Sequence, residues 1–536
     1  MIKLFRQFSR KAIFLMFLFF PFLLMASLSE EILSGMTLDE KIGQLFMIPA
    51  CPKRDENHLK DLKKLLDVYH IGSVIIKQSD PIIQISFLNY LQSISKYPLL
   101  VSADAEWGLA MRMENTIAFP KNMTLGAVSE DSLIYEMGKE IGRMLRSVGV
   151  HINLAPVVDI NNNPLNPIIK IRAFSDDKYK VAKKALQLVN GMKDENVIAC
   201  IKHFPGYGDI VTDPHLGLPV AYHDYKRLQD IEFYPYDFLI DQGVEAIMTA
   251  HIMLPNLSDK PATMSKKIID ILIKDKNYKN LIITDALNMK ALTDHYSIEE
   301  IALESHMSGN DILLYGDHIG PNVDDILNNQ IPRAFNAIKQ AYLDNKLNEK
   351  YLDKCVLKIL KAKESLKLFE NRSVPDYDPK IILNPNALFL KKRLFDQALT
   401  IVKNNNSIFP IDLNKKIAYI SSKKDLADDL IAQDFLSDFK SYTIDSVNFN
   451  FPSYDYVIIG IYESDLSEDL INRINKLKAK NISIFFFGSV YKMIQFLNFE
   501  NIILAYEEDD YAIESAIDFI RNRIKANGIL PIHICD

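Results

Sequence analysis

Eight short apolar runs punctuate most of the chain before residue 320. They begin near residues 43, 71, 98, 151, 197, 245, 281 and 311, and amphipathic segments separate most of them. Residues 131–148 are one such segment, in which apolar positions such as Leu133 and Met137 fall on one helical face. Eight alternations of strand and helix predict an α/β protein with a (β/α)8 TIM barrel over residues 36–366.

Polar side chains stand where several of these runs end. They are Asp104, Glu106, Asp159, Lys202, His203, His251 and Asp285. In a TIM barrel the carboxyl ends of all strands lie at one face, where active sites are built. Polar residues also mark the points where strands leave a core, but this would account for one or two positions better than for so many. The pattern therefore favours a polar site at one rim of the barrel.

Residues 201–220, IKHFPGYGDIVTDPHLGLPV, carry the densest group of reactive side chains. Lys202 and His203 follow the fifth apolar run, and a loop rich in glycine and proline then presents Asp213 and His215. An aspartate two residues before a histidine can orient the imidazole and raise its basicity, as in hydrolytic triads. A single histidine at a strand end is more often a structural hydrogen-bonding group, so the prediction depends on the whole set. Sequence alone leaves open whether the two side chains meet.

A second α/β pattern follows the barrel. Residues 367–385 are polar and contain three prolines, which is typical of a linker, and residues 386–536 form the second unit. We expect strands at 417–421, 456–462, 482–489 and 502–506 and a helix at 468–480. This pattern predicts a smaller, open and largely parallel sheet, and no glycine-rich phosphate-binding motif points to a nucleotide.

The N-terminus has the features of an export signal. Basic residues between positions 3 and 11 precede an apolar run at 12–28, which small residues end. The run is about 17 residues long, whereas spanning a bilayer typically takes about 20. We expect a signal peptide over residues 1–28, with an uncleaved membrane anchor as the alternative. Either one places the rest of the chain outside the cytoplasm, in the periplasm or the extracellular space.

Composition excludes several classes of partner. The net charge of −7 gives no reason to expect a nucleic acid or an anionic membrane surface. Four scattered cysteines without a CxxC pair indicate neither a zinc site nor a disulfide framework. Cys200 lies inside an apolar run and is expected to be a core residue.

The polar rim suits retaining glycoside hydrolysis. In that reaction a carboxylate attacks the anomeric carbon, and a second group protonates the leaving oxygen and later activates water. Asp285 is the candidate carboxylate, and a histidine, which titrates near neutral pH, can perform both proton steps. Five charged or polar side chains are candidates to bind sugar hydroxyl groups: Asp104, Arg112, Arg172, Lys202 and His203. Trp107 is expected either to stack on a sugar ring or to pack in the core.

Four ordered motifs resemble those of glycoside hydrolase family 3, in its β-N-acetylhexosaminidase branch. They are SADAEWGLAMRM, IKIRAFSDD, IKHFPGYGDIVTDPH and LIITDALNM. ALTIVKNNNSIFPI and NGILPI resemble parts of the second, αβα-sandwich domain of two-domain members.

The resemblance implies a role for each candidate residue. Asp285 would be the nucleophile and His215 the general acid/base, with Asp213 as its partner, while the five charged or polar side chains above would bind substrate. The implied substrate is terminal β-linked N-acetylglucosamine on peptidoglycan fragments, a small carbohydrate or muropeptide, with no metal or organic cofactor.

Two positions depart from the family pattern, in which the loop reads GHG and then DSH. Here Tyr207 occupies the middle of the first motif and Pro214 the middle of the second. Pro214 leaves Asp213 and His215 in place but stiffens a loop expected to move during catalysis, so we expect it to affect rate. Tyr207 removes an imidazole outside the Asp213–His215 pair, and the sequence gives it no role.

Three alternatives remain open. A phosphorylase of the same branch is one, because a histidine acid/base does not repel incoming phosphate as a carboxylate does. A β-glucosidase is less favoured, because such members resemble one another in lacking the Asp-x-His loop. The third is a non-catalytic, wall-associated sugar-binding protein. Membrane contact is expected only through residues 1–28, and the sequence does not determine the oligomeric state.

Overall fold

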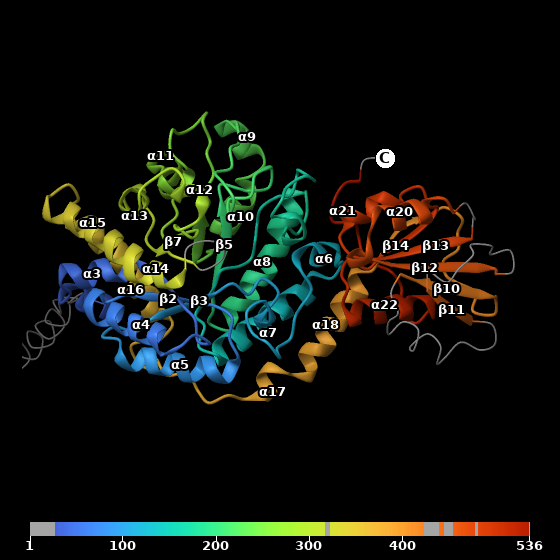
Figure 1. Ribbon diagram of the computed structural model, residues 1–536, viewed down its shortest axis with the longest axis horizontal. Coiled ribbons are helices and arrows are strands. Elements are labelled where there is room, and N and C mark those ends of the chain that lie inside the picture. The colour runs from blue at the N-terminus through green and yellow to red at the C-terminus, as the bar shows by residue number, and fades with distance from the viewer. Residues whose placement is uncertain (1–26, 317–321, 423–438, 444–453, 478–480, 535–536) are drawn as a thin grey trace, which may run out of the picture.

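The computed structural model in Figure 1 describes residues 27–316, 322–422, 439–443, 454–477 and 481–534. The expected signal peptide or anchor, residues 1–28, lies outside these ranges except for its last two residues. Within the described ranges, no helix is both long and apolar enough to cross a membrane.

The predicted barrel is confirmed. Eight parallel strands are hydrogen-bonded in the order β7-β6-β5-β4-β3-β2-β1-β8, and a bridge between Ile283 and Ile312 closes the ring. The strands are β1 (Phe46–Ala50), β2 (Ser73–Ile76), β3 (Leu100–Ala103), β4 (Ile152–Asn153), β5 (Ile198–Phe204), β6 (Ala246–Thr249), β7 (Leu281–Thr284) and β8 (Leu313–Leu314). Each of the eight apolar runs supplies one strand, and Cys200 is fully buried in β5.

Helices surround the barrel and precede its first strand. They are α2 (Leu28–Ser34), α3 (Leu38–Gln44), α4 (Glu56–Tyr69), α5 (Pro81–Ile94), α6 (Asn122–Ala127), α7 (Asp131–Ser147), α8 (Lys178–Asp194), α9 (Tyr225–Asp230), α10 (Tyr234–Asp241), α11 (Lys266–Asp270), α12 (Lys290–Thr293), α13 (Ile298–Ser308), α14 (Val323–Asp325), α15 (Ile331–Leu343) and α16 (Glu349–Ser365). Short 3₁₀ turns, η1 (Leu109–Met111), η2 (Lys170–Arg172) and η3 (Ala262–Met264), and π turns, η4 (Ile271–Asp275) and η5 (Ile326–Gln330), interrupt the loops and helices.

The pair α7 and α8 shows why these sequences form and pack as they do. The apolar face expected over 131–148 is buried, including Leu133 and Met137. Where the helices cross, a Cβ atom on Gly191 would lie 2.2 Å from the Tyr135 carbonyl oxygen, so only glycine permits this spacing. Close packing of this kind fixes α7 and α8 against each other.

Strand β5 runs further than the sequence indicated. The apolar run ends at Ile201, but β5 continues through Lys202 and His203 to Phe204. The Val158 N–H donates to the Lys202 carbonyl oxygen at 2.7 Å, which ties this extension to the neighbouring β4 segment. Lys202 and His203 are therefore held by the sheet and not by a loop.

The second domain is built around a six-stranded sheet in the order β11-β10-β12-β13-β14-β9, with only β9 antiparallel in the strands described. Its elements are α17 (Pro379–Ile382), α18 (Pro385–Ala398), β9 (Thr400–Asn404), β10 (Ile417–Ser421), β11 (Phe439–Thr443), β12 (Tyr456–Tyr462), η7 (Glu463–Asp465), α20 (Glu468–Asn475), β13 (Ile482–Phe487), α21 (Val490–Met493), η8 (Ile494–Phe496), β14 (Asn501–Leu504) and α22 (Asp510–Ile520). The four expected strands are β10, β12, β13 and β14, whereas β9 and β11 were not expected. The helix expected over 468–480 is shorter, and residues 478–480 lie outside the described ranges.

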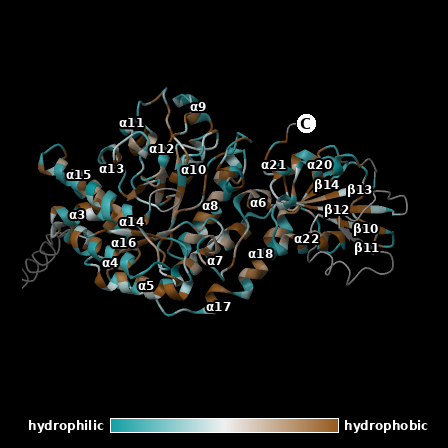
Figure 2. Ribbon diagram, in the orientation of Figure 1, coloured by the Kyte–Doolittle hydropathy of each residue, from teal (hydrophilic) through white to brown (hydrophobic). Residues whose placement is uncertain are grey.

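Helices cover both faces of this sheet, which confirms the αβα sandwich. Phe485 of β13 packs toward Phe519 of α22 on one face, with ring centroids 6.4 Å apart. Phe486 packs toward Phe496 of η8 on the other face, at 5.9 Å. In Figure 2, β12 and β13 are mostly hydrophobic along their length, as expected for strands buried on both faces.

The two domains are in contact. The Asn89 side chain in α5 exchanges two hydrogen bonds with the backbone of Val374, so the expected linker lies against the barrel. The Asn161 amide donates to the Tyr491 hydroxyl at 2.6 Å, and the Lys121 N–H donates to the Glu507 carboxylate at 2.8 Å. The carboxyl edge of the second sheet therefore faces the barrel near α6, as Figure 1 shows. α16 ends at Ser365 and α18 begins at Pro385.

Candidate active site

A cavity of about 180 Å³ opens at the carboxyl ends of the barrel strands. Seven of the eight sequence-predicted site residues line it, and the eighth, Asp213, contacts one of them. The lining residues are Asp104, Glu106, Met111, Arg112, Leu154, Ile168, Arg172, Lys202, His203, Tyr207, Pro214, His215, Met248, Asp285, Met289 and Leu314.

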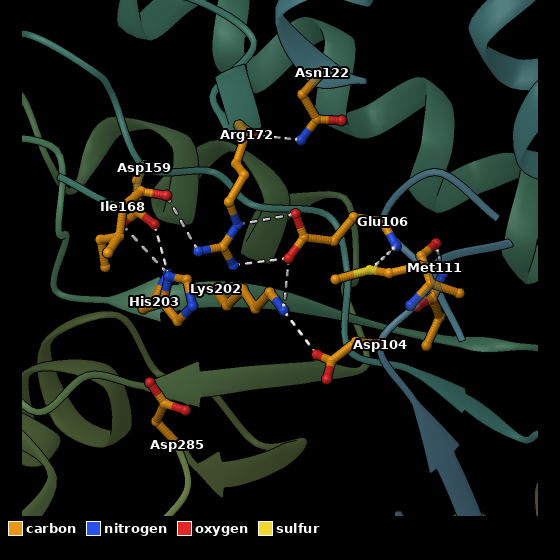
Figure 3. Close-up of polar contacts among 12 residues, drawn as sticks. Asp104, Glu106, Met111, Asn122, Asp159, Ile168, Arg172, Lys202, His203 and Asp285 are labelled. Atoms are coloured by element: carbon orange, nitrogen blue, oxygen red, sulfur yellow. Dashed lines mark hydrogen bonds and ion pairs between the residues drawn. The ribbon is translucent and has the colours of Figure 1, made fainter. Parts of the chain in front are cut away.

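Five charged side chains form one continuous chain of ion pairs along the cavity wall. The Lys202 ammonium lies 3.0 Å from both Asp104 Oδ1 and Glu106 Oε1. Arg112 donates to Asp104 at 2.6 Å, and Arg172 binds both oxygens of Glu106, at 2.7 and 3.1 Å. Figure 3 shows Lys202 joining the two carboxylates. Asp104 and Glu106 follow β3, and Lys202 lies near the end of β5. Arg172 is the last residue of η2.

Burial and pairing together fix the charges of this network. Burial alone would raise the pKa of Glu106, but Arg172 and Lys202 overcome it and lower that pKa to about 2. Burial likewise disfavours the Lys202 ammonium, yet Glu106 and Asp104 raise its pKa above the ordinary value. The Glu106 carboxylate and the Lys202 ammonium are therefore ionised at neutral pH, and their hydrogen-bonding atoms are held in place by their ion pairs.

His203 has one ring nitrogen engaged by the protein. Its Nδ1 lies 2.7 Å from Asp159 Oδ2, and the second oxygen of Asp159 accepts the Tyr207 N–H at 2.7 Å. A carboxylate on Nδ1 favours the tautomer in which Nδ1 carries the proton. This leaves Nε2 as the acceptor that His203 can offer to a hydroxyl group in the cavity.

Asp285 follows β7 and is held by backbone contacts. Its N–H donates to the Thr249 carbonyl oxygen at 3.0 Å, and its Oδ1 accepts the Ala286 N–H at 2.8 Å. Burial would raise the pKa of Asp285, but His251, His203, the Ala286 N–H and Lys202 together lower it. Figure 3 places the carboxylate across the His203 ring from the Arg172–Glu106 pair. An ionised carboxylate thus faces the cavity.

His251 supports the backbone beside Asp285. Its Nε2 lies 2.9 Å from the Ala286 carbonyl oxygen and its Nδ1 lies 2.8 Å from the Thr263 hydroxyl. Burial lowers the pKa of His251. Because both ring nitrogens are occupied, His251 is not a candidate proton donor to substrate.

Asp213 and His215 meet, which answers a question that the sequence left open. The imidazole Nδ1 of His215 lies 2.8 Å from Asp213 Oδ1, and the same oxygen accepts the His215 N–H at 2.9 Å. About a fifth to a quarter of each side chain is exposed. Pro214 between them accepts the Ala291 N–H at 3.2 Å. The dyad is therefore open to solvent at the cavity mouth and anchored to α12.

Tyr207 gains a role that the sequence could not supply. Its hydroxyl accepts the His251 N–H at 2.5 Å, and its ring packs at 4.9 Å from the His203 ring. The Asn166 amide donates to its carbonyl oxygen at 2.6 Å. Tyr207 is fully buried and connects β6 to the histidine that lines the cavity.

Sequence reasoning placed Glu106, Asp159 and His251 at the polar rim but assigned them no role in the site. All three stand at the ends of apolar runs, which is the signal that identified Asp104 and Asp285. Trp107 does not line this cavity but a second one beside the other domain. In the part of the chain that the structure describes, no three His, Cys, Asp or Glu side chains are grouped so as to hold a metal ion.

Comparison with known proteins identifies the family. Residues 37–362 match the glycosyl hydrolase family 3 N-terminal domain. β-Hexosaminidase A of Pseudoalteromonas piscicida is 30% identical over 389 residues, which cover 67% of this chain and 64% of that protein. β-Hexosaminidase LpqI of Mycobacterium tuberculosis is 26% identical over 60% of this chain and 82% of its own length. A family 3 β-N-acetylglucosaminidase structure from Paenibacillus covers 93% of this chain and 99% of its own, with 26% identity and a TM-score of 0.79. The chain therefore belongs to glycosyl hydrolase family 3.

Proposed function

We propose that this protein is a retaining exo-β-N-acetylglucosaminidase. The observation that carries the proposal is that the Asp285 carboxylate and the His215–Asp213 pair meet at one small cavity. A carboxylate and a separate proton donor at one site are the equipment for a double displacement.

The first step forms a covalent glycosyl-enzyme. Asp285 attacks the anomeric carbon while the glycosidic bond breaks, and His215 donates its Nε2 proton to the leaving oxygen. Asp213 stabilises the imidazolium that exists before this transfer and holds the tautomer with a proton on Nδ1. In the second step, neutral His215 takes a proton from water, the water oxygen bonds to the anomeric carbon, and Asp285 leaves as a carboxylate.

The charged network supplies substrate binding. Asp104, Arg112, Arg172, Lys202 and His203 present fixed donors and acceptors to the hydroxyl groups of one terminal sugar. A cavity of about 180 Å³ suits removal of single residues from a chain end. The β-hexosaminidase and β-N-acetylglucosaminidase relatives support terminal β-linked N-acetylglucosamine as the substrate. We assign peptidoglycan fragments as its source, and residues 1–28 as the signal or anchor that places the enzyme outside the cytoplasm.

A phosphorylase is the second candidate. The proton donor here is an imidazole with a carboxylate behind it, so an anionic acceptor that approaches the anomeric carbon meets no acid/base carboxylate directly. In that reaction phosphate replaces water in the second step, and the product is a sugar phosphate.

Turnover of an aryl β-N-acetylglucosaminide by residues 27–536, with and without phosphate, tests both candidates. This fragment keeps Ser27, which caps α2. We expect release of the aryl group without phosphate and a loss of at least about a thousandfold in Asp285→Asn. Strict dependence on phosphate identifies the phosphorylase instead. An aryl β-glucoside is the comparison substrate. A folded wild type that turns over neither substrate contradicts both candidates and favours a sugar-binding protein.

A further inference from the structure

A second cavity, of about 530 Å³, lies between the barrel and the second domain. It is nearly three times the size of the catalytic cavity and falls within the range of about 300–1,000 Å³ common for small-molecule sites. Trp107, Phe119 and Ile171 contribute the barrel wall, and residues that follow β12, β13 and β14 contribute the opposite wall. Open parallel sheets bind ligands at this edge, outside the carboxyl ends of their strands.

A thin wall separates the two cavities. Glu106 and Arg172 face the catalytic cavity, whereas their neighbours in sequence, Trp107 and Ile171, face the second one. The bidentate ion pair between buried Glu106 and partly exposed Arg172 joins the two segments that carry these neighbours. Each cavity therefore has its own lining.

The barrel wall offers aromatic surface. Trp107 is the only tryptophan of the chain and is partly exposed, and its carbonyl oxygen accepts the Phe119 N–H at 2.9 Å. The Lys121 ammonium lies 5.7 Å from the centre of the indole ring, which shows that the ring face can receive a cation. Aromatic faces also pack against the apolar face of a sugar ring.

The opposite wall is acidic. Four carboxylates line the cavity, from Glu463, Glu507, Glu508 and Asp509. Two lysines pair with them: Lys391 lies 2.6 Å from Asp509, and Lys121 lies 3.9 Å from Glu507. The protein already orients their oxygens: the Ser489 N–H donates to Glu463 at 2.6 Å, and the Thr124 hydroxyl donates to Glu507 at 2.5 Å. Fixed acceptors in excess over cations favour a ligand with several donors and a positive charge.

We propose that this cavity is a second ligand site, distinct from the catalytic cavity, that binds a saccharide with a free amino group, of which glucosamine is the simplest. The indole receives the ring face, and the acidic wall receives the ammonium and hydroxyl donors. This site stands whether or not Asp285 is the nucleophile, because it shares no side chain with the proposed reaction.

The single tryptophan gives a direct test. Tryptophan fluorescence of the Asp285→Asn protein is followed during titration with glucosamine, glucose or N-acetylglucosamine, with the catalytic cavity saturated by N-acetylglucosamine in the first two titrations. We expect a saturable change with glucosamine and binding about tenfold weaker, or absent, for the two neutral sugars. Glu463→Gln keeps the hydrogen bond from Ser489 but removes the charge, and should weaken glucosamine binding about tenfold. Glu514→Gln, at an exposed position of α22, is the matched control and should leave binding unchanged.

Three results overturn the proposal. The first is the absence of a saturable response to glucosamine in the millimolar range. The second is equal binding of glucosamine and glucose, or glucosamine binding that Glu463→Gln does not alter. The third is a glucosamine response that is present in a titration without N-acetylglucosamine but is lost when N-acetylglucosamine saturates the catalytic cavity, which would make the two cavities one site.

Discussion

The Nδ1 atom of His215 lies 2.8 Å from the Oδ1 atom of Asp213, with only Pro214 between the two residues in the chain. The same aspartate oxygen accepts the His215 N–H, so backbone and side chain are fixed by one acceptor. This local geometry makes a proton-carrying group from neighbouring residues of a single loop. Its proposed function depends on the carboxylate remaining charged behind the ring.

Replacement of Asp213 by asparagine should therefore lower kcat by about 10²–10⁴, because the imidazole loses its charged partner and its preferred tautomer. The alkaline limb of the pH profile of kcat/KM should also move to lower pH, since the imidazolium that donates the first proton is less stabilised. Steady-state kinetics across pH measures both effects. Asp294→Asn, an exposed aspartate after α12, is the control and should match wild type. Equal loss in both variants would contradict the role of Asp213.

Pro214→Ser tests the stiffness of the same loop. A serine leaves the carbonyl that accepts the Ala291 N–H but restores backbone freedom. We expect kcat to rise a few fold and the free energy of unfolding to fall by about 0.4–1 kcal/mol, because proline restricts the unfolded chain. Turnover and denaturant titration on one preparation measure the two changes. A fall in kcat with an unchanged free energy of unfolding would show that catalysis requires the rigid loop.

Glu106→Gln should damage both activity and stability. The change leaves the buried Lys202 and the partly exposed Arg172 without their shared carboxylate, and breaking a buried pair costs about 3–5 kcal/mol. We expect kcat/KM to fall at least a hundredfold, since the donors of the cavity wall lose their positions. Glu114→Gln, which removes an exposed partner of Lys53, is the control and should change stability by less than about 1 kcal/mol.

The pH dependence of that stability difference has a defined sign. The pKa of Glu106 is lowered from 4.5 to about 2 in the folded protein, so its stabilising contribution is fully present above about pH 4.5. That contribution is lost as pH falls through 2. Denaturant titrations of wild type and Glu106→Gln should therefore converge as the pH is lowered from 5 toward 2. A constant difference across this range would contradict the assigned ion pair.

Lys363, buried in α16 against the Gln44 side chain, provides an independent test of the fold. Burial lowers the pKa of this lysine from 10.5 to about 7. Between pH 7 and 10.5 the unfolded chain therefore binds more protons at this lysine than the folded protein does. As a result, the free energy of unfolding of wild type rises as pH increases from 7 to 10.5. Lys363→Met should flatten this rise and stabilise the protein at pH 7 by roughly 1–4 kcal/mol.

The control for Lys363→Met is Lys361→Met, at an exposed position of the same helix. It should leave both the stability at pH 7 and its pH dependence close to wild type. Thermal unfolding from pH 6 to 10 records all three proteins. An unchanged pH dependence in Lys363→Met would mean that the buried amine keeps an ordinary pKa.

The barrel was predictable because each of its strands is buried on both sides and reads as a continuous apolar run. Asp104 and Asp285 could be named because a carboxylate directly after such a run must lie at the carboxyl end of a barrel strand. β9 was not predictable, since it is an edge strand whose Ile401 is exposed and whose sequence shows no continuous run.

Contacts between residues far apart in the sequence could not be predicted either. Arg172 and Glu106 are 66 residues apart, and nothing in either motif states that they form a bidentate pair. The role of Tyr207 depends on the His251 backbone 44 positions away. The cavity beside Trp107 arises only because the second sheet presents its carboxyl edge to the barrel. The first two features follow from packing within the barrel and the third from the packing of one domain on the other. The periodicity of apolar residues indicates neither kind of contact.

The most direct test of the proposed mechanism is to trap the covalent intermediate on Asp285. Wild type is incubated with an activated N-acetylglucosaminyl fluoride whose ring carries a second fluorine that slows the breakdown of the glycosyl-enzyme, and is then digested and analysed by mass spectrometry. We predict one added glycosyl unit on the peptide that contains Asp285, and no adduct in Asp285→Asn. An enzyme that turns over substrate yet carries no adduct, or carries it on a different residue, would contradict the assignment of Asp285 as nucleophile.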